Sequence, residues 1–269
     1  MPGSSRESSA EGDAPRCGMS APSILLANFA DGASLARAAA ADWLKALEGA
    51  ARRGGAYCVA LFGGRIARQF LLAAAGLLLA PETAARAGEL LERVHFFWGD
   101  ERCVPPEDPE SNFRLARECW LGPLGIPAER VHRVRGEAPP PQAAAAAAAE
   151  LRRWAAVGAG GQPALDLVFL GLGEEGHVAS LFPGEPEEVM ASAAVYRPVV
   201  VPKPPPERIT LGYPALVAAR EVWVLAAGPG KGAALRASLE PTGATPMARL
   251  LRQRSSTRIF TDAPPAQAR

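Results

Sequence analysis

The sequence contains little cysteine and no surplus of charge of either sign. Its four cysteines, Cys17, Cys58, Cys103 and Cys119, are scattered and include no C-x-x-C pair. This spacing argues against a disulfide framework or a metal site and favours reduced thiols in a cytoplasmic protein. The 29 Lys and Arg residues nearly balance the 28 Asp and Glu residues. Nothing in this balance favours nucleic acid or an anionic membrane as a partner.

Long apolar segments are also missing. The longest apolar run, residues 70–80, is shorter than the roughly 20 residues that a membrane-spanning helix requires. The chain begins MPGSSRESSAEGDAPRCG, which is polar and lacks an apolar signal core, so residues 1–22 are predicted to be a disordered tail. Hydrophobic residues make up 48% of the chain. Residues 23–269 are therefore expected to form a single α/β domain.

Short apolar runs alternate with helical patterns along the chain. The run LDLVFL at residues 165–170 has the length and the β-branched and aromatic content of a strand buried on both faces. The alternation predicts one mostly parallel sheet with helices on both faces. The expected strands are residues 23–27, 57–61, 94–98, 165–170, 196–200, 208–211 and 221–226, with 259–260 closing the sheet. The expected helices follow Asp31, span 66–80, lie near 113–120, contain the alanine run 143–149 and follow Lys231.

Glycine and charge are combined where four of these strands end. The four loops are FGGR at 62–65, GDER at 99–102, GLGEEGH at 171–177 and GPGK at 228–231. Because the carboxyl ends of parallel strands lie on one edge of a sheet, and ligands bind there, we expect the four loops to converge. This edge is the candidate functional site.

The loop at 171–177 also matches the dinucleotide-binding pattern G-x-G-x-x-G, through Gly171, Gly173 and Gly176. That pattern requires a long helix directly after it, whose N-terminus binds the pyrophosphate. Here Pro183 and Gly184 would end such a helix within two turns, and the two glutamates of the loop would repel phosphates. A nucleotide-dependent enzyme is therefore disfavoured, and the chain also lacks the Walker and G-x-S-x-G motifs.

Three histidines are present, and one has a catalytic context. His177 ends the glycine loop two residues after Glu175, and a carboxylate at that spacing can orient an imidazole and raise its basicity. A histidine that merely caps a tight turn would show the same local pattern. His95, at a strand, and His132, in an apolar and basic segment, are expected to be structural or solvated.

Charged side chains at the same edge indicate an anionic ligand. Arg102 could bind an anionic oxygen while Asp100 orders its loop. Arg65 and Lys231 adjoin glycines whose amides could form an anion-binding nest. These features favour a phosphorylated small molecule. Lys203 and Arg208, on either side of a proline-rich turn, could add to the site or be ordinary surface charges.

With these residues in view, the sequence resembles the 6-phosphogluconolactonases, in the larger family that includes glucosamine-6-phosphate deaminase. The motifs that carry the resemblance are WGDERCVPPEDPESN (98–112), GLGEEGHVASLFPG (171–184), PKPPPERITL (202–211) and AAGPGKGAAL (226–235). The resemblance covers nearly everything after the tail and implies a Rossmann-like sheet. It implies a lactonase that uses no metal or other cofactor, acts on a phosphorylated sugar lactone and is a monomer or weak homodimer.

The resemblance also implies roles for individual residues. His177 would be the general base that activates water for attack on 6-phospho-D-glucono-1,5-lactone, with Glu175 beside it. Arg102 and Asp100 would belong to the active site, and Arg208 and Lys231 would hold the substrate phosphate. The remaining expected substrate-binding residues are Gly63, Gly64, Arg65, Asn112 and Gly173.

Two positions depart from the family pattern. The first loop usually reads Ser-Gly-Gly-Ser, whereas here Phe62 and Arg65 flank the two glycines. Arg65 could replace a hydroxyl contact with a charged one or fill the pocket. The family has aspartate where this chain has Glu175, which moves the carboxylate by one methylene. The altered first loop leaves a sugar-phosphate-binding protein without activity as one alternative, and the other is an amino-sugar-phosphate deaminase or isomerase of the same fold.

Overall fold

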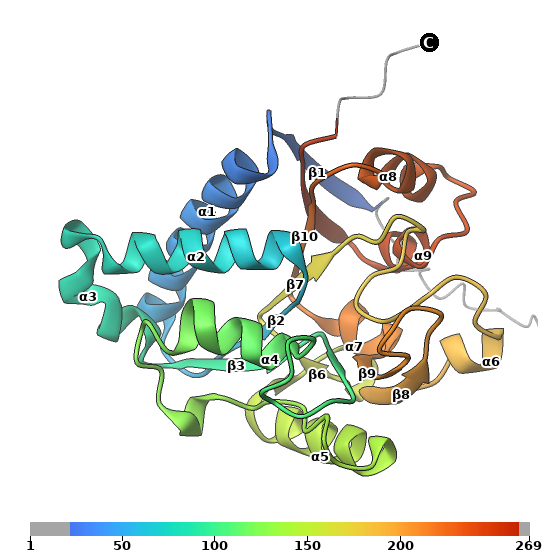
Figure 1. Ribbon diagram of the computed structural model, residues 1–269, viewed down its shortest axis with the longest axis horizontal. Helices are drawn as coiled ribbons and strands as arrows, with labels where there is room; N and C mark the ends of the chain where they lie inside the picture. Colours follow the sequence, from blue (N-terminus) through green and yellow to red (C-terminus); the bar gives the residue numbers. More distant parts are fainter. Residues whose placement is uncertain (1–21, 264–269) are drawn as a thin grey trace, which may run out of the picture.

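The computed structural model describes residues 22–263, so all but the last residue of the predicted tail lies outside the described part. Its centre is a six-stranded sheet with the order β1-β11-β10-β7-β2-β3, in which every neighbouring pair is parallel (Figure 1). The strands are β1 (Ser23–Asn28), β2 (Tyr57–Leu61), β3 (Val94–Trp98), β7 (Leu167–Gly171), β10 (Glu221–Ala226) and β11 (Ser256–Thr261). The predicted parallel α/β sheet is therefore confirmed.

Helices connect and cover these strands. In Figure 1, α1 and α2 lie on one side of β10 and β7, and α8 and α9 lie on the other. The longer helices are α1 (Gly32–Arg53), α2 (Arg65–Leu79), α3 (Pro81–Leu91), α5 (Pro140–Trp154), α8 (Lys231–Leu239) and α9 (Pro246–Gln253). Shorter ones are α4 (Asn112–Ala116), which runs into a π-helical turn η1 (Arg117–Leu121), η2 (Ala128–Arg130), η3 (Ala159–Gly161), α6 (Glu187–Met190) and α7 (Tyr213–Ala218).

The sequence explains how α1 begins and what it buries. The Asp31 carboxylate accepts a hydrogen bond from the Ser34 amide at 2.7 Å, and the Ser34 hydroxyl lies 3.2 Å from the Asp31 amide, which forms a capping box. On its buried face, Trp43 stacks on Trp120 with ring centroids 4.5 Å apart and meets Phe169 of β7 edge-on at 5.0 Å. This aromatic cluster attaches α1 to the central strand and so fixes the loop that follows β7.

A second sheet departs from the predicted single sheet. Strands β4 (Asp100–Arg102), β9 (Glu207–Leu211) and β8 (Tyr196–Val200) form an antiparallel sheet in the order β4-β9-β8. The prediction that residues 196–200 and 208–211 extend the main sheet is wrong. The connection between β8 and β9 is only six residues long, which suits a hairpin, whereas a parallel crossover needs a dozen or more. A further two-stranded hairpin pairs β5 (Ala156–Val157) with β6 (Pro163–Ala164).

Asp100, predicted to lie in a loop, is therefore the first residue of a strand. Only Gly99 separates β4 from β3, so the small sheet continues directly from the carboxyl end of the main one. This junction brings residues of β4 and β9 to the edge where β2, β7 and β10 end.

No single helix within residues 22–263 has both the length and the apolar content to cross a membrane. Among the described helices, α2 and α3 reach that length and apolar content when taken together, but the chain bends by 105° between them.

Candidate active site

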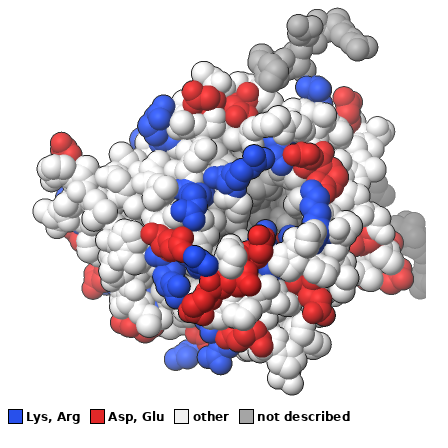
Figure 2. All heavy atoms as spheres, in the orientation of Figure 1, with Lys and Arg blue, Asp and Glu red and all other residues white. Residues whose placement is uncertain are grey.

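A cavity of about 310 Å³ lies at the carboxyl ends of β2, β7 and β10. Figure 2 shows it as a hollow near the middle of this face, with basic side chains along much of its edge. All four loops that the sequence predicts to converge contribute to its lining. The candidate residues that line it are Gly63, Gly64, Arg65, Asp100, Arg102, Asn112, Gly173, His177, Arg208 and Lys231. Phe62, Glu174 and Lys203 line it as well.

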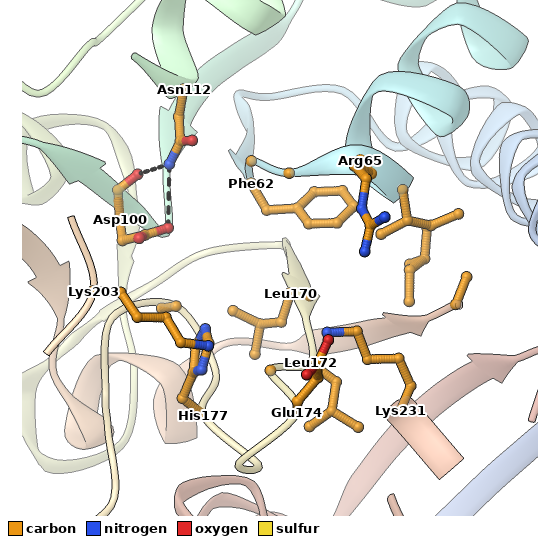
Figure 3. A pocket seen from close by; sticks show the side chains of 18 of the residues that line it. Phe62, Arg65, Asp100, Asn112, Leu170, Leu172, Glu174, His177, Lys203 and Lys231 are labelled. Carbon is orange, nitrogen blue, oxygen red and sulfur yellow. Dashed lines mark hydrogen bonds between the residues drawn. The ribbon is translucent and has the colours of Figure 1, made fainter. Parts of the chain in front are cut away.

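The imidazole of His177 is held between an aromatic ring and a glycine. The ring of Phe182 stacks on it with centroids 4.1 Å apart and an angle of 14° between the planes. On Gly173, a Cβ atom would lie 1.9 Å from Nδ1 of His177, so only glycine leaves room for the ring. The Gly173 amide also donates a hydrogen bond to the His177 carbonyl at 2.9 Å. These contacts fix the imidazole at the cavity wall (Figure 3).

Glu175 lies beside this imidazole, as the sequence predicts. Its Oε2 is 3.2 Å from Nδ1 of His177, although the angles at that distance do not make a hydrogen bond. Burial lowers the pKa of His177, and the charge of Glu175 only partly opposes this. Burial acts to raise the pKa of Glu175, but a hydrogen bond from Lys203 and other favourable contacts outweigh it and hold the pKa at about 2. At neutral pH the pair is therefore a carboxylate next to a neutral imidazole.

Asp100 is part of a buried polar network. Its Oδ2 accepts a hydrogen bond from the Ser180 hydroxyl at 2.6 Å, and Nδ2 of Asn112 donates to its carbonyl oxygen at 2.9 Å. Asn112 packs so closely on the first loop that a Cβ on Gly63 would lie 1.8 Å from its Oδ1. Asp100, Asn112 and Gly63 are thus joined in one corner of the cavity, although they come from three different segments.

Glu101 is a residue that the sequence analysis did not single out. It is 2% exposed and its carboxylate accepts hydrogen bonds from the amides of Arg102, Asn112 and Phe113 and from the Ser111 hydroxyl. Burial raises its pKa to about 7, and the backbone hydrogen bonds oppose the rise. Because all four partners are donors, the ionised carboxylate fits this environment. Glu101 therefore fixes the start of α4, and with it Asn112.

Two arginines reach the cavity from neighbouring strands. Arg102 of β4 and Arg208 of β9 are direct cross-strand partners. Arg102 donates to the carbonyl and, at 3.3 Å, to the side chain of Glu110. Arg208 is 5% exposed and its Nε donates to the Pro205 carbonyl at 3.0 Å. Burial and the neighbouring Arg102 lower the pKa of Arg208.

Arg65 and Lys231 lie across the cavity from Asp100 and His177 (Figure 3). Each is the first residue of a helix, α2 and α8 respectively, so each helix N-terminus adjoins the cavity. Free backbone amides and the helix dipole at such a terminus favour an anion. Burial lowers the pKa of Lys231, while Glu174 acts to raise it.

The other two histidines lie outside this cavity. His95 Nδ1 is 2.9 Å from His132 Nε2, and Nδ1 of His132 is 3.0 Å from Glu150. Trp154 stacks on His95 with centroids 3.9 Å apart. The sequence left open whether His95 and His132 are structural or solvated, and this stack fits the structural alternative. Within the described residues, no three His, Cys, Asp or Glu side chains are grouped as metal ligands.

Comparison with known proteins identifies the family of the chain. A model of the family "Glucosamine-6-phosphate isomerases/6-phosphogluconolactonase" matches residues 30–260. The 6-phosphogluconolactonase of Streptomyces coelicolor is 37% identical over 215 residues, which cover 78% of this chain and 80% of that protein. That of Mycobacterium tuberculosis is 39% identical over 169 residues, covering 61% and 68%.

Solved structures show the same fold. The 6-phosphogluconolactonase of Trypanosoma brucei superimposes with a TM-score of 0.77 at 26% identity, over 89% of this chain and 96% of that one. A monomeric glucosamine-6-phosphate deaminase has a TM-score of 0.71 at 15% identity, over 89% and 96%, and so shares the fold alone. The chain belongs to the glucosamine-6-phosphate isomerase/6-phosphogluconolactonase family.

Proposed function

We propose that this protein hydrolyses 6-phospho-D-glucono-1,5-lactone to 6-phospho-D-gluconate, as a 6-phosphogluconolactonase of the pentose phosphate pathway. The observation that carries the proposal is the position of His177, a half-buried imidazole with a lowered pKa in the wall of a cavity that has cations on opposite sides. The 6-phosphogluconolactonase relatives support the same substrate class.

In the proposed reaction, neutral His177 takes a proton from a water molecule through Nε2, since Nδ1 faces Glu175 and Gly173. The water oxygen forms a bond to the lactone carbonyl carbon, and the negative charge moves to the carbonyl oxygen. When the tetrahedral intermediate collapses, the bond to the ring oxygen breaks. His177 returns its proton to that oxygen, so that the products are a hydroxyl group and a carboxylic acid, which then ionises. Asp100 and Arg102 are proposed to complete the active site around the lactone.

The phosphate is proposed to bind on the side of the cavity where Arg65 and Lys231 begin their helices. The amides of Gly63 and Gly64 would add hydrogen bonds there. Arg65 is exposed and lines the cavity, which supports a charged contact to phosphate in place of the family's hydroxyl groups. Arg208 lies over Phe182 on the His177 side of the cavity and is therefore the alternative phosphate ligand, while Asn112 and Gly173 shape the cavity.

The test is hydrolysis of freshly prepared 6-phosphogluconolactone, with spontaneous hydrolysis subtracted, by the wild type and by His177→Asn. We expect the wild type to accelerate hydrolysis and the variant to lose at least about 100-fold in kcat, as expected for loss of a general base. The variant should still bind 6-phosphogluconate, which shows that its cavity is intact.

Two results would contradict the proposal. Binding of 6-phosphogluconate without any turnover by the wild type would indicate a sugar-phosphate-binding protein. Release of ammonia from glucosamine 6-phosphate would instead indicate the deaminase chemistry of the same fold.

A further inference from the structure

Lys203 makes a contact that the sequence did not indicate. It lies in the turn after β8, and its Nζ is 2.7 Å from Oε1 of Glu175. The other oxygen of the same carboxylate, Oε2, is the one 3.2 Å from Nδ1 of His177. The carboxylate of Glu175 therefore lies between the ammonium group of Lys203 and the imidazole of His177, and each of its two oxygens faces one of these groups.

Lys203 also contacts the other neighbour of His177. Its Nζ is 5.9 Å from the centroid of the Phe182 ring, the ring that stacks on the imidazole at 4.1 Å. Such a cation over an aromatic face is favourable. Lys203 thus lies near both side chains that flank the imidazole, and Figure 3 places it with His177, across the cavity from Arg65 and Lys231.

The charges around His177 come from three segments. Glu175 and Asp100 favour its protonated form, and Lys203 disfavours it. Arg208 adds a further positive charge over the Phe182 ring, at 6.0 Å. Without Lys203, the carboxylate of Glu175 would act on the imidazole with its full charge, and its side chain would be free to change rotamer.

We propose that Lys203 is a positioning residue, which holds Glu175 beside Nδ1 of His177 and offsets the carboxylate charge so that the imidazole stays neutral and ready to accept a proton. The catalytic part of this inference rests on the proposed lactonase function. The structural part concerns only the protonation of His177, which can be measured without substrate.

The first experiment is an NMR titration of the histidine ring protons in the wild type and in Lys203→Met. The chain has only three histidines, so the His177 signal can be assigned as the one missing from His177→Asn. We expect the His177 titration to move to higher pH in Lys203→Met and to stay near the wild-type position in Lys203→Arg, which keeps the charge. An unmoved titration in Lys203→Met would overturn the proposal.

Two controls separate this effect from a general change of charge. Lys45→Met removes another lysine, whose Nζ lies 2.9 Å from Asp42 on α1 and outside the cavity, and should leave the titration unchanged. In a Glu175→Gln background, Lys203→Met should shift the His177 titration much less than in the wild type, because the carboxylate is no longer there. A full-sized shift in that background would overturn the role of Glu175 as the intermediary.

Kinetics provide the second readout. In Lys203→Met we expect kcat for the lactone to fall by about tenfold or more near pH 7, since displacement of a catalytic group by 1 Å can cost about 100-fold. KM should stay within about twofold, and the acidic limb of kcat/KM should move to higher pH. A KM raised more than about tenfold with an unmoved acidic limb would make Lys203 a substrate ligand instead. If the wild type shows no turnover, the proposed function fails, while the titration still decides the role of Lys203.

Discussion

Gly173 and His177 occupy complementary space: a Cβ on residue 173 would lie 1.9 Å from Nδ1 and 2.2 Å from Cε1 of the imidazole. The two residues are also joined through the backbone, since the Gly173 amide donates to the His177 carbonyl at 2.9 Å. Gly173 is therefore explained by the position of the His177 ring and not by binding of a pyrophosphate. A pattern that resembles a nucleotide-binding motif is explained here by the space one imidazole needs.

Gly173→Ala is expected to reduce lactone hydrolysis by about 100-fold. The new methyl group must push the imidazole away from its place against Phe182, and a shift of about 1 Å is enough for such a loss. The measurement is kcat/KM together with the melting temperature. Gly76→Ala is the control, because a Cβ at this exposed position in α2 meets nothing within 4 Å and should stabilise the helix by about 0.5–1 kcal/mol. Full activity in Gly173→Ala would contradict the close fit.

Arg65→Ser restores the hydroxyl that the family's first loop carries. If Arg65 binds the substrate phosphate, its removal should raise KM by about tenfold and leave kcat within about twofold, because a contact made equally in ground and transition states is lost. Arg68→Ser is the matched control. Arg68 lies almost one turn further along α2, pairs with Glu118 at 3.2 Å and does not line the cavity. An unchanged KM in Arg65→Ser would contradict the phosphate contact, and a lower KM would show that Arg65 obstructs the pocket.

Glu101→Gln should destabilise the protein and lower its activity. The amide group would turn an NH₂ toward partners that are themselves donors, which leaves buried groups without hydrogen bonds at a cost of about 1–3 kcal/mol. The free energy of unfolding, measured in urea, should fall by that amount, and kcat should fall because Asn112 is displaced. Glu92→Gln, an exposed glutamate at the end of α3, should change neither quantity. Equal stability of the two variants would remove Glu101 from the support of the site.

Stability should decrease as the pH falls from about 6.5 to about 4. Burial, aided by the nearby His132, lowers the pKa of His95 to about 4, whereas an unfolded histidine titrates near 6.5. Between these values the unfolded chain binds a proton that the folded chain does not, so stability rises with pH, by up to ~1.4 kcal/mol per pH unit. The check is urea unfolding at several pH values. His95→Phe, which can keep the stack on Trp154, should show a shallower slope, and an identical slope would contradict this assignment.

The sequence was enough to predict the central strand and the edge at which the site forms. Residues 165–170 are apolar except for Asp166, so a buried strand was the natural interpretation, and β7 spans Leu167–Gly171. The glycines and charges after it pointed to the carboxyl edge of a parallel sheet. The order of residues along one strand and its loop is local information. For this reason the sequence also predicted that the carboxylate of Glu175 lies next to the imidazole of His177.

Contacts between distant segments were not predictable in the same way. Glu101 is flanked by two other charged residues and looks like a solvated run, but β4 turns it inward onto the start of α4. Lys203 lies in a proline-rich turn and reaches Glu175 only because β8 and β9 form a separate antiparallel sheet. That sheet was mistaken for part of the main one because apolar alternation does not specify a partner strand.

The register of that small sheet sets Arg102 directly opposite Arg208. Like charges in this arrangement repel one another, and with Arg208 buried the repulsion is only partly screened. The carboxylates of Glu110 and Asp100 offset part of this repulsion. A bound anion near the two guanidinium groups would offset more of it, and such a ligand would therefore also stabilise the folded chain.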